Sequence, residues 1–589
     1  MNDTAGRPQA LGRTSISDDA SRELLAAIGQ WTGGMSPQAF GGAWLNVVSR
    51  LALAPGRQLE LAGQAFRKSI ELAQFAGQAV RGVDEPVAPQ VAGTPYASRF
   101  SDEAWARFPF NVLAQAFVTG AELAREAVRQ VPGAEPDAQY VAGFTVREGL
   151  ELLAPDNYLP TNPQLIAQTR EERGQNLLRG LRNLADDVQR TFKGQGPVGV
   201  ENYVVGKHTA VTPGKVILRN SLMELIQYAP ATEDVHAEPV LIVPAWIMKY
   251  YILDLSPGNS LVKYLTDMGH TVFMVSWKNP TAEDRDVSMD DYVSLGVLAA
   301  LDAIGQVVPR RKVHAVGYCI GGTLLAISAA TLAQRADERL ASATLFAAQT
   351  DFSEPGELSV FISPAQLAML EALMWKKGVL ESRQMGGAFQ LLRTYDLLWA
   401  PSVQSYLKGE RLGVNDLMAW NADGTRMAYR MHTDYLHQLY LDNDLAQGRY
   451  VALGETIDLA SIEVPMFVVG TETDHVAPWK SVYKVGKLVR SKDYTFCLTS
   501  GGHNAGIISG PQHPRRRHRV LTMKTGARLP SAEQYLQKVE PQQGSWWPTF
   551  AAWLAAHSSP RRVAPPKMGN AKKGLKPIGD APGEYVLAR

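Results

Sequence analysis

The segment HAVGYCIGG, residues 314–322, places a cysteine where a hydrolase would carry its nucleophile. Gly317, Cys319 and Gly321 form G-x-C-x-G, which differs from the G-x-S-x-G elbow of serine hydrolases only at the central residue. Residues typical of a strand precede Cys319 and residues at helical spacing follow it, as this sharp turn requires. A helix N-terminus favours a thiolate. The segment therefore indicates a nucleophilic cysteine, although the motif alone does not exclude a buried structural one.

A nucleophile of this type needs an acid and a histidine, in that order, later in the chain. Asp474 follows a strand predicted over 465–470, and His503 lies in a glycine-flanked loop after a strand predicted over 493–498. Ligands and catalytic groups collect at such strand ends in parallel sheets. The order Cys319, Asp474, His503 fits a catalytic triad. Two alternatives stay open, because Glu472 is a second candidate acid and Asp474 could simply cap a turn.

The remaining groups near this constellation have simpler predicted roles. His475 is expected to be structural because it lacks flanking glycines, and Cys497 is expected to be a small core residue in the middle of a strand. The backbone N–H of Ile320 should face a developing oxyanion. A second N–H is expected from Trp246 or Ile247, in the loop after the strand predicted over 239–243.

Short apolar strands alternate with helical segments after residue 200. This alternation predicts a mainly parallel sheet covered on both faces, and with the elbow it predicts an α/β-hydrolase fold over residues 201–589. The alternation pauses at about 352–460, where a helical, aromatic segment is expected to form a cap over the site. The strands are predicted over 216–218, 239–243, 271–276, 312–317, 342–347, 465–470 and 493–498.

Residues 1–200 are predicted to form a mostly α-helical N-terminal domain. Helical periodicity covers roughly 43–79, 108–131 and 176–192, whereas 82–97 is rich in Pro and Gly and predicts a linker. The first 30-odd residues are polar and are expected to be loose. The tail after Pro560 is expected to run extended along the surface, with its basic residues solvated.

Composition narrows the class of protein. The 589 residues carry a formal net charge of +1, which gives no reason to expect nucleic acid as a partner. No apolar run is long enough for a transmembrane segment, and the first residues lack the apolar core of a secretory signal. With two cysteines far apart, a disulfide scaffold is not expected, so a reducing cytoplasm is the default prediction. No cofactor and no metal are expected.

At these motifs the chain resembles the polyhydroxyalkanoate synthases, and more closely the single-subunit, short-chain type (class I). The resemblance extends from about Phe100 onward. It is carried by GYCIGGT around Cys319, KYYILDL (249–255), VSWKNP (275–280), WNADGTRM (420–427), TDHVAPW (473–479) and GSWWP (544–548).

The resemblance implies the function and the roles of the triad. Cys319 would be the covalent nucleophile, with Asp474 and His503 completing the triad. The substrate class would be (R)-3-hydroxyacyl-CoA, most simply 3-hydroxybutyryl-CoA, and the product a polyester. The enzyme would act as a homodimer at the surface of cytoplasmic polymer granules.

The chain departs from the family pattern at a few positions. Met248 replaces a usual Asn, Ala400-Pro401 replace Asn-Tyr, Ala428 replaces Pro, and Asn504 follows the histidine where an apolar residue is usual. Ala400, Pro401 and Ala428 fall in the predicted cap, so they bear on acyl-chain preference more than on the type of reaction.

Cysteine suits a transferase that turns thioesters into esters. An acyl-cysteine is a thioester like the CoA substrate, so loading is nearly even in free energy and transfer to a hydroxyl is downhill. Two rivals remain at this stage. One is a cysteine-dependent hydrolase, either an acyl-CoA thioesterase or a polyester depolymerase, and the other is a granule-coat protein without catalytic activity.

Overall fold

The computed structural model describes residues 16–81, 86–524 and 528–589. They form two compact units. The first contains the chain up to Pro37, Val205–Met385 and Asp423–Arg589, and the second contains Gln38–Val204 and Gly386–Ala422. The segment 386–422, in the middle of the predicted cap, therefore groups with the N-terminal helices, and residues 16–37 group with the sheet.

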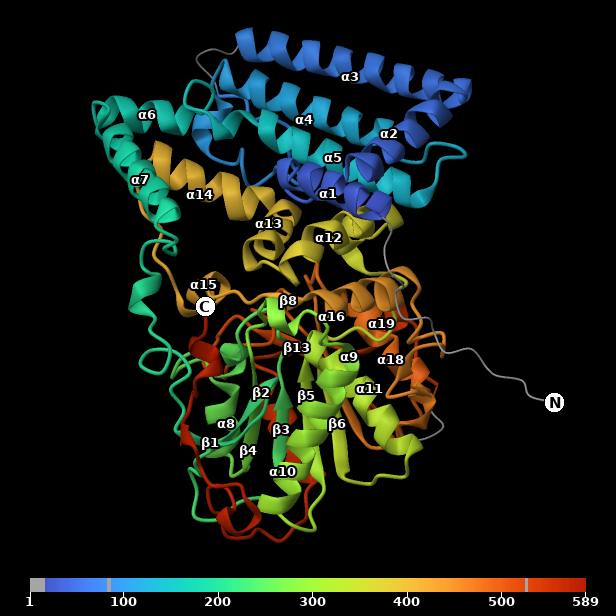
Figure 1. The fold of residues 1–589 in the computed structure, drawn as a ribbon. Coiled ribbons are helices and arrows are strands. Elements are labelled where there is room, and N and C mark those ends of the chain that lie inside the picture. Colours follow the sequence, from blue (N-terminus) through green and yellow to red (C-terminus); the bar gives the residue numbers. More distant parts are fainter. Residues whose placement is uncertain (1–15, 82–85, 525–527) are drawn as a thin grey trace, which may run out of the picture. The chain divides into compact units, whose positions relative to one another are not determined.

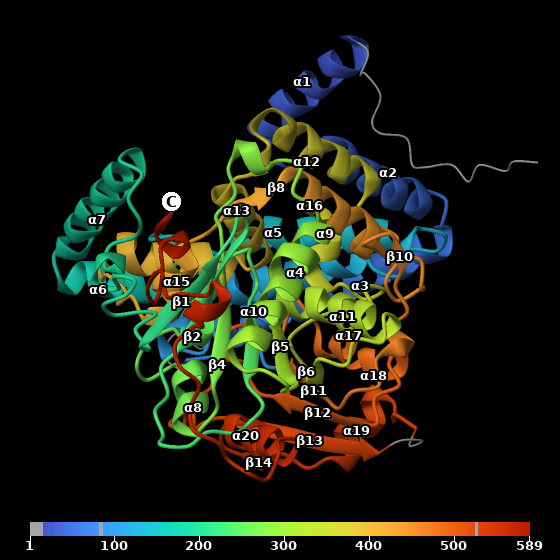
Figure 2. The ribbon, with the colours of Figure 1, turned by 60° about the horizontal axis from the view of Figure 1, so that its bottom comes forward.

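The first unit is built on an eleven-stranded sheet (Figures 1 and 2). All seven strands that the sequence predicts are present, within a few residues of the expected bounds. In spatial order the strands are β14 (Gln542–Gln543), β13 (Arg517–Lys524), β12 (Asp493–Thr499), β11 (Met466–Thr471), β6 (Leu340–Phe346), β5 (Val313–Tyr318), β3 (Val240–Val243), β4 (Val272–Trp277), β2 (Met223–Tyr228), β1 (Gly214–Arg219) and β15 (Gly579–Asp580).

The six central strands, from β12 to β4, run parallel. Their residues are buried almost without exception, as expected for apolar strands covered on both faces. Helix α11 (Ile320–Gln334) packs on β3, β5 and β6. Helix α20 (Trp547–Ala556) packs Phe550 against Phe346 of β6 and Phe467 of β11. Because the strands are parallel, their carboxyl ends share one edge of the sheet.

Four antiparallel strands of the sheet, β2, β13, β14 and β15, were not predicted. Polar residues explain this for the two longer ones, β2 and β13. Strand β2 carries Glu224 and Gln227, which are buried yet fully engaged. The Glu224 carboxylate accepts the backbone N–H groups of Glu584 and Tyr585, each at 3.0 Å. The tail after Pro560 thus supplies partners that a local pattern cannot reveal. Strand β13 carries Arg517, Arg519 and Lys524, and three of its eight residues are exposed.

The second unit is helical, as the sequence predicts. The helical run expected over 43–79 is two helices, because Pro55 begins a new one. The unit contains α2 (Pro37–Ala52), α3 (Pro55–Arg81), α4 (Phe110–Ala127), α5 (Pro136–Leu153), α6 (Pro163–Glu171) and α7 (Gln175–Phe192), together with α14 (Ala400–Ser402), α15 (Asp416–Ala422) and the end of α13 (Ser382–Leu392).

A buried arginine links the N-terminal helices to segment 386–422 within this unit. Arg99 forms ion pairs of 2.6 Å with Glu151 and 2.7 Å with Asp156. Its guanidinium lies 3.9 Å from the ring centroid of Tyr395. Because a buried carboxylate is costly without its partner, this cluster favours the association of the two chain segments.

The expectation that the first 30-odd residues are loose is wrong for residues 16–31. They form α1 (Ile16–Trp31), which packs on α12 (Pro364–Lys377) in the first unit. At Gly29 an added Cβ would lie 2.8 Å from the Met369 sulfur, so the two helices approach each other closely there. Residues 1–15 lie outside the described part of the chain, as do 82–85 of the predicted linker.

Candidate active site

Cys319 occupies the turn between β5 and α11, with φ 53° and ψ −128°. Positive φ is uncommon for a residue other than glycine, and strain of this kind collects at functional sites. The neighbouring glycines are sterically required. A Cβ on Gly317 would lie 2.4 Å from the Gly322 Cα, and one on Gly321 would lie 2.3 Å from the Val243 carbonyl oxygen. The strand, turn and helix expected of a nucleophile elbow are therefore present.

Ile320 is the first residue of α11. The first four N–H groups of a helix lack an intrahelical acceptor, so its N–H is available to a group at the elbow. Cys319 is partly exposed, whereas Cys497 is buried in β12, where burial raises its thiol pKa. The two cysteines thus differ in exposure, as a reactive thiol differs from a core residue.

Asp474 follows β11 and its side chain is fully buried. Its Oδ1 accepts the N–H groups of Val476 and Ala477, at 2.9 and 2.8 Å. Its Oδ2 accepts Nδ1–H of His503 and the hydroxyl of Thr471, both at 2.8 Å. Burial opposes ionisation, but the His503 charge and these hydrogen bonds hold the pKa of the Asp474 carboxyl below its ordinary value.

His503 lies in the loop after β12 and is buried. Burial disfavours its charged form, but attraction to Asp474 and Cys319, with side-chain hydrogen bonds to both, raises the pKa of His503 well above its ordinary value. Because Nδ1 is bonded to Asp474, Nε2 is the nitrogen that meets the sulfur. The structure thus brings together the three residues that the sequence singles out.

The alternative acid and the neighbouring histidine lie differently. Glu472 forms an ion pair of 3.0 Å with Arg517. His475 directly follows Asp474, and its carbonyl oxygen lies close to Gly356. Asp474, rather than Glu472, contacts His503.

The GSWWP segment anchors the loop that carries the histidine. The indole N–H of Trp546 donates to the Gly506 carbonyl at 3.0 Å, and that of Trp547 donates to the Ile507 carbonyl at 2.9 Å. Ser545 donates to the Ser509 carbonyl. All three donors are buried. These residues and Thr471 support the triad. The contacts of the GSWWP segment could not be predicted from local patterns, because their partners lie 36 to 40 residues away. Thr471 acts locally, on Asp474 three residues later.

The loop after β3 lies against the start of α11. The Cβ that Gly321 lacks would approach the Pro244 carbonyl oxygen at 2.5 Å. Within this loop Trp246 is buried and stacks on Tyr292 with ring centroids 4.1 Å apart. Its carbonyl accepts the Thr425 hydroxyl at 2.5 Å. Trp246 and the partly exposed Ile247 therefore sit in the chain segment next to the elbow, and their oxyanion role stays a prediction.

Three aromatic residues from the predicted cap segment cluster beside the triad. Phe352 lies 4.7 Å from Tyr440, and Tyr440 lies 5.3 Å from Tyr435, between ring centroids. Burial is the main cause that raises the pKa of Tyr435 and Tyr440, and the charge of Cys319 adds to it. Both phenols thus lie within the field of the sulfur, in surroundings that limit water.

The departures from the family pattern fall at defined places. Met248 forms an isolated antiparallel β-bridge with Gly424. Ala428 lies in β8 (Met427–Ala428), which pairs with β7 (Val379–Leu380). Ala400 and Pro401 lie in the short helix α14, in the helical unit.

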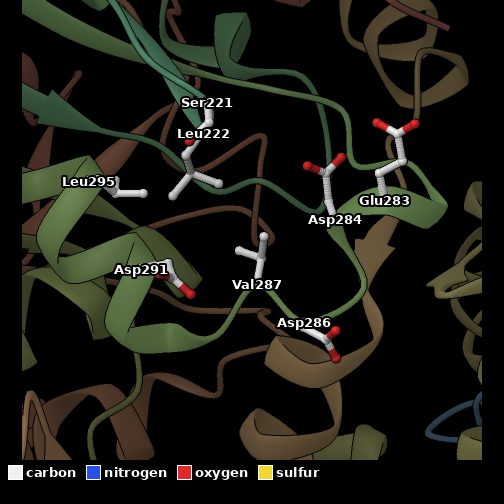
Figure 3. A pocket seen from close by; sticks show the side chains of 8 residues that line it. All are labelled: Ser221, Leu222, Glu283, Asp284, Asp286, Val287, Asp291 and Leu295. Carbon is white, nitrogen blue, oxygen red and sulfur yellow. The ribbon is translucent and has the colours of Figure 1, made fainter.

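Figure 3 shows the residues around a hollow of about 290 Å³ in the first unit. It is lined by Ser221, Leu222, Glu283, Asp284, Asp286, Val287, Asp291 and Leu295. The acids Asp284 and Asp291 already close capping boxes, and Asp284 also pairs with Lys278 at 2.7 Å. None of Cys319, Asp474 and His503 lines this hollow, so it is not the catalytic centre.

Comparisons with known proteins identify the family. Residues 96–265 match the N-terminal region of poly-beta-hydroxybutyrate polymerase (PhaC), and residues 238–508 match the α/β hydrolase fold. The chain is 38% identical over 518 residues to the poly(3-hydroxyalkanoate) polymerase subunit PhaC of Rhizobium etli, covering 87% of this chain and 80% of that protein. The chain belongs to the poly(3-hydroxyalkanoate) polymerase family.

Other poly(3-hydroxyalkanoate) polymerases match over a similar length. The polymerase of Methylorubrum extorquens is 38% identical over 86% of this chain and 82% of its own. The PhaC subunit of Cupriavidus necator is 34% identical over 85% of this chain and 84% of its own. The predicted family and the predicted α/β-hydrolase fold are confirmed, and the chain is an enzyme of polyhydroxyalkanoate synthesis.

None of the helices in the described ranges combines the length and apolarity needed to cross a membrane. Nor do three or more His, Cys, Asp or Glu side chains gather, among the residues that the structure describes, in a way that could hold a metal ion.

Proposed function

We propose that the enzyme polymerises (R)-3-hydroxyacyl-CoA into polyester through a thioester on Cys319, and that 3-hydroxybutyryl-CoA is its preferred substrate. The observation that supports this most is the strained turn at Cys319 beside the buried Asp474–His503 pair. A strained nucleophile, a histidine and an orienting acid are the parts of acyl-transfer catalysis.

In the loading step the Cys319 sulfur attacks the thioester carbonyl carbon of the substrate. The bond from that carbon to the CoA sulfur then breaks, and His503 gives the proton it holds to the departing CoA thiolate. The raised pKa of His503 supports this role, because the imidazolium is ready as the acid while the sulfur attacks.

In the transfer step a 3-hydroxyl group attacks the acyl-Cys319 carbonyl. His503 takes the hydroxyl proton, the ester bond forms, and the carbon–sulfur bond to Cys319 breaks. Asp474 holds Nδ1–H so that Nε2 is free to accept that proton, and it stabilises the imidazolium that results. The oxyanion of both steps would be met by the N–H of Ile320 and by one from Trp246 or Ile247.

Water is the competing acceptor, and it separates this proposal from a cysteine hydrolase. The buried cluster of Phe352, Tyr435 and Tyr440 supports exclusion of water from the acyl-enzyme. Incubation with 3-hydroxybutyryl-CoA tests the choice. Insoluble polyester with release of CoA supports a synthase, free hydroxy acid indicates a hydrolase, and no CoA release indicates a coat protein.

The proposal extends to the working state of the enzyme, which we take to be a homodimer at the surface of cytoplasmic polyester granules. The resemblance to the single-subunit synthases supports this. Sedimentation of the purified protein, with and without 3-hydroxybutyryl-CoA, tests the dimer. Co-sedimentation with the polymer that it forms tests the association with granules.

A further inference from the structure

A hydrogen bond joins the residue before the nucleophile to the residue after the histidine. The Tyr318 hydroxyl donates to Oδ1 of Asn504. Tyr318 ends β5 and is almost fully buried, and its ring centroid lies 5.5 Å from that of His503, at an interplanar angle of 33°. One side-chain contact therefore bridges the two chain segments that carry the sulfur and the imidazole.

The chemistry of the pair makes this contact persistent. Burial, followed by the charges of Cys319 and Asp474, raises the pKa of Tyr318 well above its ordinary value, so the hydroxyl remains a donor at any working pH. The Asn504 amide oxygen only accepts. Loss of either partner would leave the other short of a hydrogen bond in a largely buried place, which is costly.

The loop that carries the histidine is held by hydrogen bonds on both sides of His503. Upstream, the Gly501 carbonyl accepts the N–H of Thr473 at 3.1 Å, and the Gly502 carbonyl accepts the N–H of Gly506 at 2.8 Å. Downstream, the Asn504 carbonyl accepts the N–H groups of Ile507 and Ile508, both at 3.0 Å, and the GSWWP segment holds the chain beyond. Among these contacts, the one made by the Asn504 side chain reaches the chain segment that carries the nucleophile.

We propose that the Tyr318–Asn504 hydrogen bond sets the distance between the imidazole of His503 and the sulfur of Cys319. The two residues form a positioning pair, since both act through the histidine. This inference rests on the proposed function only in assigning His503 and Cys319 to the reaction. It gives a role to Asn504, which stands where the family usually has an apolar residue.

A double-mutant cycle of Tyr318→Phe, Asn504→Leu and the double variant tests the pair. The first readout is the single-turnover rate of CoA release from 3-hydroxybutyryl-CoA. The second is the pH profile of Cys319 alkylation by iodoacetamide, which needs no substrate. Alkylation reports one thiol, because Cys497 is buried. Tyr228→Phe, which removes another buried hydroxyl, from β2, is the matched control and should leave both rates unchanged.

Each single variant should slow both rates about tenfold, the order expected when a buried hydrogen bond is broken. The double variant should be no slower than either single one, and its urea midpoint should return toward wild type because no polar atom is left unpaired.

Three results would overturn the inference: single variants with wild-type rates, losses that multiply in the double variant, or a double variant that regains both wild-type rates. If the wild-type enzyme releases no CoA, the proposed function fails instead, and the alkylation profiles still decide the positioning role.

Discussion

Replacement of Asp474 by asparagine should leave the fold intact and move a proton on the histidine. Oδ1 accepts two backbone N–H groups, from Val476 and Ala477, so the asparagine oxygen must take that place. The amide NH2 then takes the place of Oδ2 and points at Nδ1 of His503. Two donors cannot face each other. The proton therefore shifts to Nε2, which can no longer accept one from the thiol or from an incoming hydroxyl.

The loss should be larger for polymer growth than for loading. Holding a catalytic histidine in the wrong tautomer costs about 10⁴-fold in rate, which corresponds to about 5.5 kcal/mol of barrier. Polymer growth should fall by this amount, because a secondary alcohol cannot attack without a base. Loading should fall less, by about 10²-fold, since cysteine thiols ionise to a few per cent without help.

The assay is rapid mixing of Asp474→Asn with 3-hydroxybutyryl-CoA, with CoA counted per active site and the acyl adduct detected by intact mass. A slow burst of CoA without polymer is expected. Equal slowing of loading and growth would refute the expectation that growth depends more than loading on His503 as a base. Wild-type rates would refute the triad. Glu472→Gln is the matched control, because Glu472 pairs with Arg517 and should be dispensable.

Two further predictions concern the fold around the site. Gly321→Ala should destabilise the enzyme by about 1–3 kcal/mol and abolish CoA release, because the added Cβ would lie 2.3 Å from the Val243 carbonyl oxygen. Gly305→Ala in α10 (Ala299–Val307) is the control and should be tolerated, because its Cβ would meet no atom within 4 Å. Urea unfolding of both variants measures the difference in stability. Burial lowers the pKa of His270 to about 3 and the pKa of His314 and His432 to about 4. Below about pH 6.5 the unfolded chain therefore binds more protons than the folded chain. As the pH falls from about 6.5 to the folded pKa, each histidine removes up to about 1.4 kcal/mol of stability per pH unit. Urea midpoints should fall over that range, and the fall should be shallower in His432→Leu; an unchanged slope in that variant would show that His432 is not buried as a neutral ring.

The triad could be predicted from sequence because its parts are local. Cys319, Asp474 and His503 each follow a short apolar strand, and parallel strands bring their carboxyl ends to one edge of the sheet. The loop after β3 could be predicted to lie beside the elbow for the same reason. Local sequence patterns therefore predict that these residues lie at the carboxyl ends of the strands.

Contacts between distant segments could not be predicted in this way. The partner of Tyr318 lies 186 residues away, and the carbonyl that accepts from Trp546 lies 40 residues before it. The assignment of segment 386–422 to the helical unit depends on side chains such as Tyr395, which meets Arg99. Helix α1 was not predicted because its sequence is largely polar, and because the helix on which it packs, α12, lies more than 300 residues later in the chain.

The central claim is that Cys319 carries the acyl group. The most direct measurement is peptide mapping of the enzyme quenched during turnover of 3-hydroxybutyryl-CoA, alongside CoA release by Cys319→Ala and Cys319→Ser. The chain has two cysteines, so a thioester adduct can form at two residues, Cys319 or Cys497. We expect a hydroxyacyl thioester on Cys319 with Cys497 unmodified, and no appreciable CoA release by either variant. Wild-type turnover by Cys319→Ala, or an adduct on another residue, would contradict it.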